Sequence, residues 1–358
     1  MKPTASIDSL PSAAYPTRVE TGSAVVRVWL LAVAALVFCM VIVGGATRLT
    51  ESGLSITQWK PVTGVVPPLD AADWQAEFDR YKQIPQFSAR NPDMTIDGFK
   101  IIYYWEWGHR LLARVVGAAF ILPGLWFWLR GKLKGALGRQ VAVATGLLAL
   151  EPIVGWWMVT SGLSERTEVA QDRLALHLLI AAATVGALIY AAAGLGAKER
   201  SSPVRRGFVA SAGALAALVF CQLGLGALVA GLRAGFMYNT WPMMGSRFLP
   251  VEAFPSPWLG AILNDPATAQ FAHRMTAYFV LAFAVAQAAA ASSAAPGSPL
   301  AQRALVLAAV ALFQVALGVA TLLLMVPLGL ALVHQATALI LFGLAVANLR
   351  ATEIERGA

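Results

Sequence analysis

The chain has 358 residues, of which 58% are hydrophobic and 13% are charged, and its formal net charge is +8. So few charged side chains cannot cover a soluble domain of this length, and the composition therefore excludes an ordinary soluble protein. The basic residues cluster in short connections between apolar segments, which indicates membrane topology and not nucleic-acid binding.

Eight apolar segments have close to the length of about 20 residues that a bilayer requires. The first of them, 25–46, is too long to be the apolar core of a signal peptide. We therefore predict an all-α polytopic membrane protein with eight transmembrane helices. Their predicted ranges are 25–46, 106–129, 140–161, 173–195, 207–231, 271–291, 302–324 and 328–349.

The charges between the spans predict how the chain is oriented. Two connections are rich in basic residues, so both are expected to face the cytoplasm, together with the two termini. The long segments 47–105 and 232–270 then lie outside. The residues concerned are Arg130, Lys132, Lys134 and Arg139 in one connection, and Lys198, Arg200, Arg205 and Arg206 against Glu199 in the other.

The first outer segment contains an amphipathic pattern. Asp70 can cap a helix, and Trp74, Phe78 and Tyr81 follow at helical spacing among charged residues. The pattern predicts a helix that lies on the membrane surface or covers a site below it, or one that packs the loop against the bundle.

The two cysteines, Cys39 and Cys221, both fall inside predicted spans. Neither a loop disulfide nor a CxxC motif for a metal or a c-type haem can therefore form. We expect both thiols to be packing residues.

Four histidines occupy matching places in the predicted topology. His109, His177, His273 and His334 each lie in the first half of a span that enters from the outer side, so they share one depth. Two imidazoles facing each other across a helix bundle suit the iron of a haem. A zinc or copper site is the competing interpretation, but no cysteine and few carboxylates stand near to complete its ligand shell.

The two halves of the chain repeat each other. The sequence of 109–113, HRLLA, is echoed by HRMTA at 273–277. Because each half holds an even number of spans, both enter the membrane in the same sense, and we predict two four-helix bundles related by a pseudo-twofold axis along the membrane normal. The predicted organisation is a cytoplasmic tail at 1–24, a bundle at 25–195 with the outer loop 47–105, a cytoplasmic linker at 196–206, a bundle at 207–349 and a cytoplasmic tail at 350–358.

One difference between the halves concerns ionisable groups. Glu106 precedes His109 by three positions and shares its helix face, whereas Gln270 precedes His273. The carboxylate indicates a reactive site in the first half, although a carboxylate favoured by the helix dipole, or one that only orients a ligand, would give the same pattern. Glu151 is a second carboxyl group inside a span, and it is either a candidate for proton movement or a hydrogen-bonded structural residue.

Arginines stand at the outer ends of helices in both halves. A guanidinium group there can form a forked contact with a haem propionate, or it can simply extend to the membrane interface. The four candidates are Arg48, Arg110, Arg233 and Arg274.

At these residues the chain resembles the haem A synthase family, the membrane enzymes that convert haem O to haem A for cytochrome oxidase, and it is most similar to the proteobacterial and mitochondrial branch. The resemblance covers nearly the whole chain. It is carried by the segments 44–55 (GGATRLTESGLS), 105–110 (WEWGHR), 155–159 (GWWMV), 238–243 (YNTWPM) and 272–274 (AHR).

The resemblance implies roles for the histidines. His109 and His177 would hold the substrate haem, with Glu106 catalytic, and His273 and His334 would hold a haem b cofactor. The implied reaction oxidises a ring methyl of haem O to a formyl group through successive hydroxylations. Some relatives have a cysteine pair in the first outer loop, and the absence of cysteine from 47–105 excludes a thiol role there.

The resemblance also implies partners and location. Haem O synthase would supply the haem, the product would enter cytochrome oxidase assembly, and the protein would lie in the bacterial inner membrane with its haem sites toward the periplasm. The electron donor or acceptor and a homo-oligomeric state are left open.

Two other functions fit paired histidines: a dihaem cytochrome that takes electrons from quinol, and a haem carrier or assembly factor.

Overall fold

The computed structural model describes residues 18–195, 205–255 and 257–357, and eight helices in this part of the chain are long and apolar enough to cross a membrane. The prediction of eight spans in an all-α protein is therefore confirmed. The predicted tail 1–24 and linker 196–206 fall largely outside the described residues. The eight helices are α1 (Arg18–Leu49), α4 (Ile96–Leu129), α5 (Gly135–Thr160), α6 (Gln171–Leu195), α7 (Arg206–Gly231), α9 (Pro266–Ala294), α10 (Pro299–Leu323) and α11 (Leu328–Gly357).

Several helices extend past the predicted spans, because polar caps determine helix ends. The helix predicted to begin at 106 begins ten residues earlier, where the Thr95 side chain accepts a hydrogen bond from the Gly98 amide. Asp265 caps α9 in the same way at Thr268. At the other end of the chain, α11 continues as a helix to Gly357.

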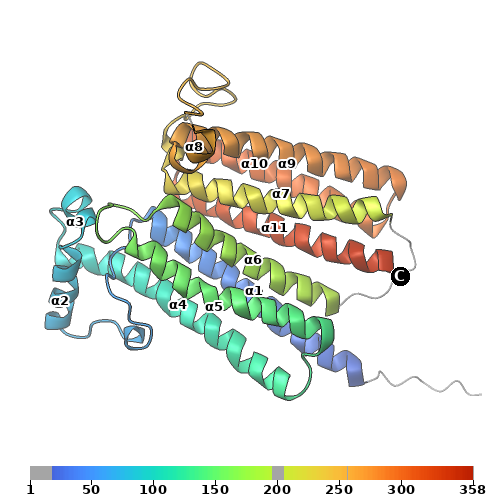
Figure 1. Ribbon diagram of the computed structural model, residues 1–358, viewed down its shortest axis with the longest axis horizontal. Helices are drawn as coiled ribbons and strands as arrows, with labels where there is room; N and C mark the ends of the chain where they lie inside the picture. Colours follow the sequence, from blue (N-terminus) through green and yellow to red (C-terminus); the bar gives the residue numbers. More distant parts are fainter. Residues whose placement is uncertain (1–17, 196–204, 256, 358) are drawn as a thin grey trace, which may run out of the picture.

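The helices form two groups of four that lie side by side (Figure 1). In the first group α1 packs on α4 and α6, and α6 packs on α5; in the second, α7 and α10 each pack on both α9 and α11. The groups meet where α6 packs on α7 and α11, and where α1 packs on α11. This arrangement fits the predicted pseudo-twofold pair of bundles.

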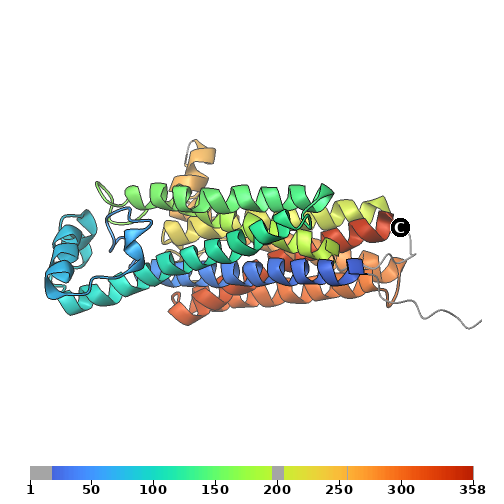
Figure 2. The same cartoon turned by 90° about the horizontal axis from the view of Figure 1, so that it is seen from below.

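The two groups differ at one pair of helices. In the second group α9 and α10 pack closely, whereas the backbones of their counterparts α4 and α5 lie farther apart and are bridged by side chains such as Arg110 over the Trp156 ring. Figure 2 shows α4 diverging from α5 toward the end of the molecule that carries the outer segment. The first group is therefore open on one side and the second is closed.

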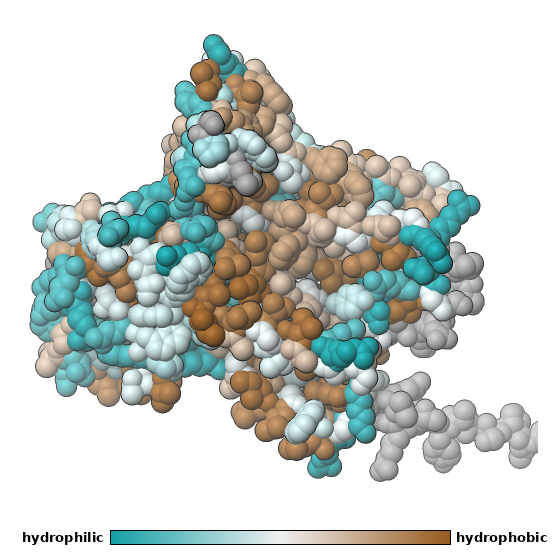
Figure 3. Space-filling model, in the orientation of Figure 1, coloured by the Kyte–Doolittle hydropathy of each residue, from teal (hydrophilic) through white to brown (hydrophobic). Residues whose placement is uncertain are grey.

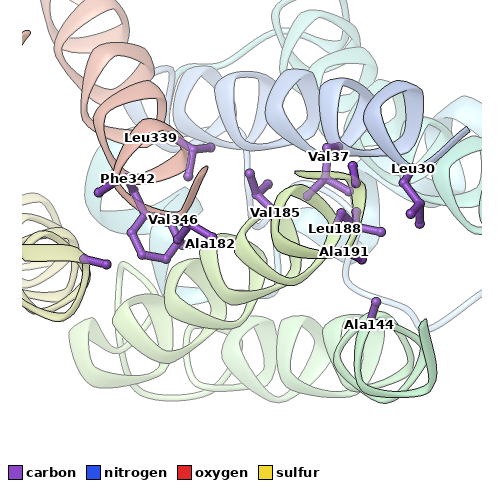
Figure 4. Close-up of a cluster of buried hydrophobic side chains, with 14 of the residues drawn as sticks. Leu30, Val37, Ala144, Ala182, Val185, Leu188, Ala191, Leu339, Phe342 and Val346 are labelled. Carbon is purple, nitrogen blue, oxygen red and sulfur yellow. The ribbon is translucent and has the colours of Figure 1, made fainter. Parts of the chain in front are cut away.

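One apolar core is shared by both groups. Helix α6 packs against both α1 and α11 (Figure 4), and its Val185 and Leu188 are buried together with Val37 of α1 and Leu339 and Phe342 of α11. Close packing of this kind holds helices together in a membrane, where lipid is as apolar as the side chains. On the visible surface an apolar band separates two polar ends (Figure 3).

The first outer segment packs on the extended start of α4. Asp70 accepts a hydrogen bond from the Asp73 amide and begins α2 (Ala71–Tyr81), as predicted. Trp74, Phe78 and Tyr81 are buried against the ring of Phe99 in α4. The predicted packing of the loop against the bundle is therefore confirmed. Short helices follow at α3 (Pro85–Arg90) and, in the second outer segment, α8 (Trp258–Asn264).

The prediction for the two cysteines is wrong. Cys39 and Cys221 are free thiols exposed on the helix surface, so neither packs into the core. The length of the apolar segments had placed them in spans, but not on a particular helix face.

Candidate haem sites

Each of the four histidines lies against a glycine of a neighbouring helix. A Cβ built on that glycine would come within 2.9 to 3.1 Å of the histidine Cε1, which is closer than an ordinary contact. Only glycine therefore lets the imidazole approach the helix backbone so closely. The pairs are Gly44 with His109, Gly155 with His177, Gly226 with His273, and Gly318 with His334.

The two histidines of the second group face each other. The ring centroids of His273 and His334 are 6.5 Å apart and the ring planes are inclined by 82°. A metal–imidazole bond is about 2 Å long, so two such bonds together with the ring radii span roughly 6 Å. The separation therefore fits one iron between the two rings.

Glutamine side chains hold this second pair. Gln222 Nε2 donates to the His273 carbonyl at 2.9 Å and lies 3.0 Å from Nδ1 of the same residue. Gln314 Nε2 donates to the His334 carbonyl at 3.0 Å. Both glutamines fix the helix turn that carries the ligand while bringing no charge to it.

The first group holds its histidines differently. Oε2 of Glu151 lies 2.7 Å from Nδ1 of His177, although the ring nitrogen does not point along a hydrogen bond to it. The contact is therefore an electrostatic one in this structure. The buried Nδ1 of His109 has no hydrogen-bond partner among the described residues.

Glu106 is buried at the outer end of the first group, with 3% of its surface exposed. Its Oε2 accepts from the Ser55 hydroxyl and the Ile56 amide, both at 2.8 Å, and its Oε1 accepts from Arg110 at 2.6 Å. None of these donors is His109, the neighbour that the shared helix face had suggested. The Glu106 carboxylate thus holds the outer loop against α4, one helical turn before His109.

Arg110 and Arg274 make matching contacts in the two groups. Arg110 donates to the carbonyls of Ile56 and Gln58, and Arg274 donates to those of Tyr238 and Thr240. Each arginine follows its histidine directly and clamps an outer loop over it. Gln270 donates a hydrogen bond to the Tyr238 carbonyl at 3.2 Å. Its counterpart in the first group, Glu106, instead accepts a hydrogen bond from the Ile56 amide.

Arg48 and Arg233 belong to an ion-pair network that joins the two groups. Nε of Arg233 lies 2.6 Å from Glu168, and Arg90 lies 2.5 Å from Glu168 and 3.0 Å from Glu51. Arg48 also pairs with Glu168, and Arg233 with Glu51. The sequence left open a contact with a propionate or extension to the membrane interface, and the structure shows these guanidinium groups paired with carboxylates of the chain.

Comparison with known proteins agrees with these features. Residues 27–346, which include all four histidines, match the sequence profile of the family described as cytochrome oxidase assembly protein. Haem A synthase of Beijerinckia indica is 47% identical over 351 residues, 96% of this chain and 98% of the relative. Haem A synthases of Brucella anthropi and of a Bradyrhizobium strain are 46% and 48% identical, and each comparison covers 91% or more of both chains.

The chain belongs to the haem A synthase family.

Two-histidine sites suit a haem A synthase. Within residues 18–195, 205–255 and 257–357, no three His, Cys, Asp or Glu side chains converge as the ligands of a bare metal ion would. Haem iron needs only two protein ligands, because the porphyrin supplies the other four. The paired histidines, their glycine contacts and the ring separation in the second group therefore fit haem.

Some residues that contact the four histidines or pair with the candidate arginines were not recognised in the sequence. Gly44, Gly226 and Gln222 contact histidines, and Glu51 and Glu168 neutralise arginines. A signal for Gln222 was present, since Gln222-x3-Gly226 repeats the spacing of Gln314-x3-Gly318. No local pattern marks Glu51 or Glu168, whose partners are remote in the sequence.

Proposed function

We propose that this protein is a haem A synthase that oxidises a ring methyl of haem O to a formyl group, and so supplies haem A for cytochrome oxidase. The observation that carries the proposal is the duplicated histidine pair with a buried carboxylate in one copy only. The family match across both halves supports it.

The reaction is a four-electron oxidation of one carbon. Two hydroxylations convert the methyl group to a hydroxymethyl group and then to a gem-diol, and each passes two electrons from the carbon to an oxidant, either dioxygen or another electron acceptor. Loss of water from the gem-diol leaves the aldehyde. Oxidation of an unactivated C–H bond depends on iron chemistry, while the protein supplies binding, orientation and proton handling.

The two histidine pairs have different proposed functions. We assign His109 and His177 to the substrate haem O, and His273 and His334 to a resident haem b. When bound, haem b supplies one-electron transfer. The more widely spaced helix pair, α4 and α5, belongs to the group that must exchange its haem, which supports this assignment.

Glu106 is the proposed catalytic residue of the first site. Its hydrogen bonds from Ser55 and Arg110 orient it and hold the loop over His109, and proton transfer during methyl oxidation is its proposed chemical role. Arg48, Arg110, Arg233 and Arg274 are proposed to lie near the propionates, and Glu151 beside His177 is a proposed proton-carrying group.

The proposed location is the bacterial inner membrane. The basic connection between α4 and α5 would face the cytoplasm, and the outer segments with both haem sites would face the periplasm. Haem O synthase is the proposed haem donor, and the cytochrome oxidase assembly pathway the acceptor.

Pigment analysis tests the proposed function. The full chain is expressed in membranes that contain haem O and lack any other source of haem A, and extracted haems are separated. Haem A should appear only with the active chain and not with a His109→Ala variant. A protein that binds two haems and forms no haem A would instead be a dihaem cytochrome.

A further inference from the structure

The residue one helical turn before each contact glycine differs among the four sites. On a helix, positions i and i+4 lie on one face, so this residue stands beside the same histidine as the glycine. The second group has glutamine at both places, whereas the first group has a thioether at one and a carboxyl group at the other. The residues are Met40 before Gly44, Glu151 before Gly155, Gln222 before Gly226 and Gln314 before Gly318.

In the second group a neutral amide holds the helix turn of each ligand. Both glutamines donate to the backbone carbonyl of their histidine, at 2.9 and 3.0 Å. A neutral amide donor in this position does not increase the electron density of the ring. His273 and His334 should therefore be ligands of similar strength.

In the first group the two ligands are unlike. Oε2 of Glu151 is 2.7 Å from Nδ1 of His177, and the side chains are only 18% and 23% exposed, so solvent screens the carboxylate weakly. His109 has the apolar Met40 at the matching place, and its Nδ1 has no hydrogen-bond partner in the described part of the chain. Only one imidazole of this pair stands beside a carboxyl group.

A carboxylate on the distal nitrogen strengthens an imidazole ligand. It stabilises positive charge on the ring and raises ligand basicity, and carboxylate partners recur beside metal-bound histidines. The matching neutral side chain provides none of these effects.

We propose that Glu151 makes His177 the strong, permanent ligand of the substrate haem and leaves His109 as the weak ligand that yields its position on the iron. This inference rests on the proposed function, because it concerns the haem held by the first group. Glu151 is here a positioning residue that acts through His177. The unequal pair explains how one half of a duplicated protein can free a coordination position on its haem iron. The other half, with matched ligands, keeps both histidines on its iron.

Exchange of the glutamate and glutamine tests the proposal. In the full-length protein, Glu151→Gln copies what Gln314 already provides, so the fold should tolerate it. Reduction potentials and low-temperature spectra are recorded for the haems of each half. Loss of the carboxylate should favour reduction of the first haem at least tenfold, which is 59 mV for one electron. The haem held by His273 and His334 should be unchanged. The reciprocal Gln314→Glu should shift only that second haem, in the opposite direction.

Ligand deletion gives an independent readout. His109→Ala should retain haem in the first group as a five-coordinate species that binds carbon monoxide, whereas His177→Ala should lose most of it. His273→Ala and His334→Ala should lose haem b to similar extents. Equal loss of haem from the first group in His109→Ala and His177→Ala would overturn the inference. An unchanged reduction potential of that haem in Glu151→Gln would also overturn it. Absence of haem from the first group of the unmodified protein would instead contradict the proposed function.

Discussion

Cε1 of His334 lies so near the backbone of Gly318 that a Cβ built on the glycine would be 2.9 Å from it. The same relationship recurs at three other histidines, in helix pairs that come from both halves of the chain. A glycine therefore sets how far each proposed haem ligand can lie from the helix behind it.

Substitution of this glycine should displace the ligand. Gly318→Ala is expected to lower haem b content several-fold, because a ring bound to iron cannot move away from the new methyl group. Haem b per protein, measured from the pyridine haemochrome spectrum, checks this. Gly146→Ala is the matched control: its Cβ meets nothing within 4 Å, and alanine is favoured in a helix by roughly 0.5–1 kcal/mol. Equal haem b in both variants would show that the close contact does not position His334.

Removal of the Glu106 charge should stop product formation. Glu106→Gln cannot accept from Arg110, Ser55 and the Ile56 amide together, and it cannot take up a proton. Haem A formation is expected to fall by about 10²–10⁴-fold, the usual contribution of a general acid or base. Haem O should accumulate, with haem b retained.

A second variant separates the two roles of Glu106. Ser55→Ala removes one loop contact and leaves the carboxylate in place. If Glu106 acts only by holding the loop, both variants should mainly raise KM for haem O. A proton-transfer role predicts that Glu106→Gln lowers kcat while Ser55→Ala does not.

Loss of either second-group histidine should remove haem b. His273→Ala and His334→Ala are each expected to abolish the low-spin bis-histidine spectrum of this site, because that spectrum needs both of the facing rings. Added imidazole should restore part of the spectrum by filling the space of the deleted ring. An unchanged spectrum in both variants would contradict the assignment of haem b.

Acid should loosen the first outer segment through Glu77. Burial alone would raise the pKa of this carboxyl group, but hydrogen bonds from Arg80 and Lys60 outweigh it and hold the pKa below its usual range. A lowered pKa means that the stabilisation is complete above the ordinary value of about 4.3 and is lost as the pH falls through the lowered value. Hydrogen-exchange protection of α2, corrected for intrinsic rates, should fall in that window. Glu77→Gln should have low protection at every pH and lose the dependence.

Site-directed labelling should report the orientation. With the two exposed cysteines replaced, Asp93→Cys is expected to react with a membrane-impermeant maleimide added from the periplasmic side. Lys132→Cys, in the connection between α4 and α5, should react only after the membrane is permeabilised. The opposite result at both positions would reverse the topology.

Sequence patterns were sufficient for the features that depend on local chemistry. Hydropathy identified the eight spans, and Asp70 with its apolar periodicity identified α2. The repeat around His109 and His273 identified which residues correspond. Each of these signals is contained in a short segment of chain.

Features that depend on remote partners were not predictable. The spacing of Glu106 and His109 suggested contact, but the carboxylate turns to a loop some fifty residues away in sequence, as its bond to Ser55 shows. Arg48 and Arg233 find Glu168 and Glu51 only when α1, α7 and the loops have packed. An apolar span also does not reveal which face of its helix is buried. For this reason the exposure of Cys39 was not predicted.

The loose pairing of α4 and α5 makes the first half depend on what it binds (Figure 2). A ligand that binds only the assembled half adds RT ln(1 + [L]/Kd) to its stability, about 2.7 kcal/mol at a concentration 100 times Kd. Bound haem O would thus stabilise this half. In membranes depleted of haem O, the first half of the protein should unfold at a lower temperature than the second half. The product has the same ring and iron and would stabilise the half almost as well. Turnover therefore requires an acceptor that binds haem A more tightly than the enzyme does.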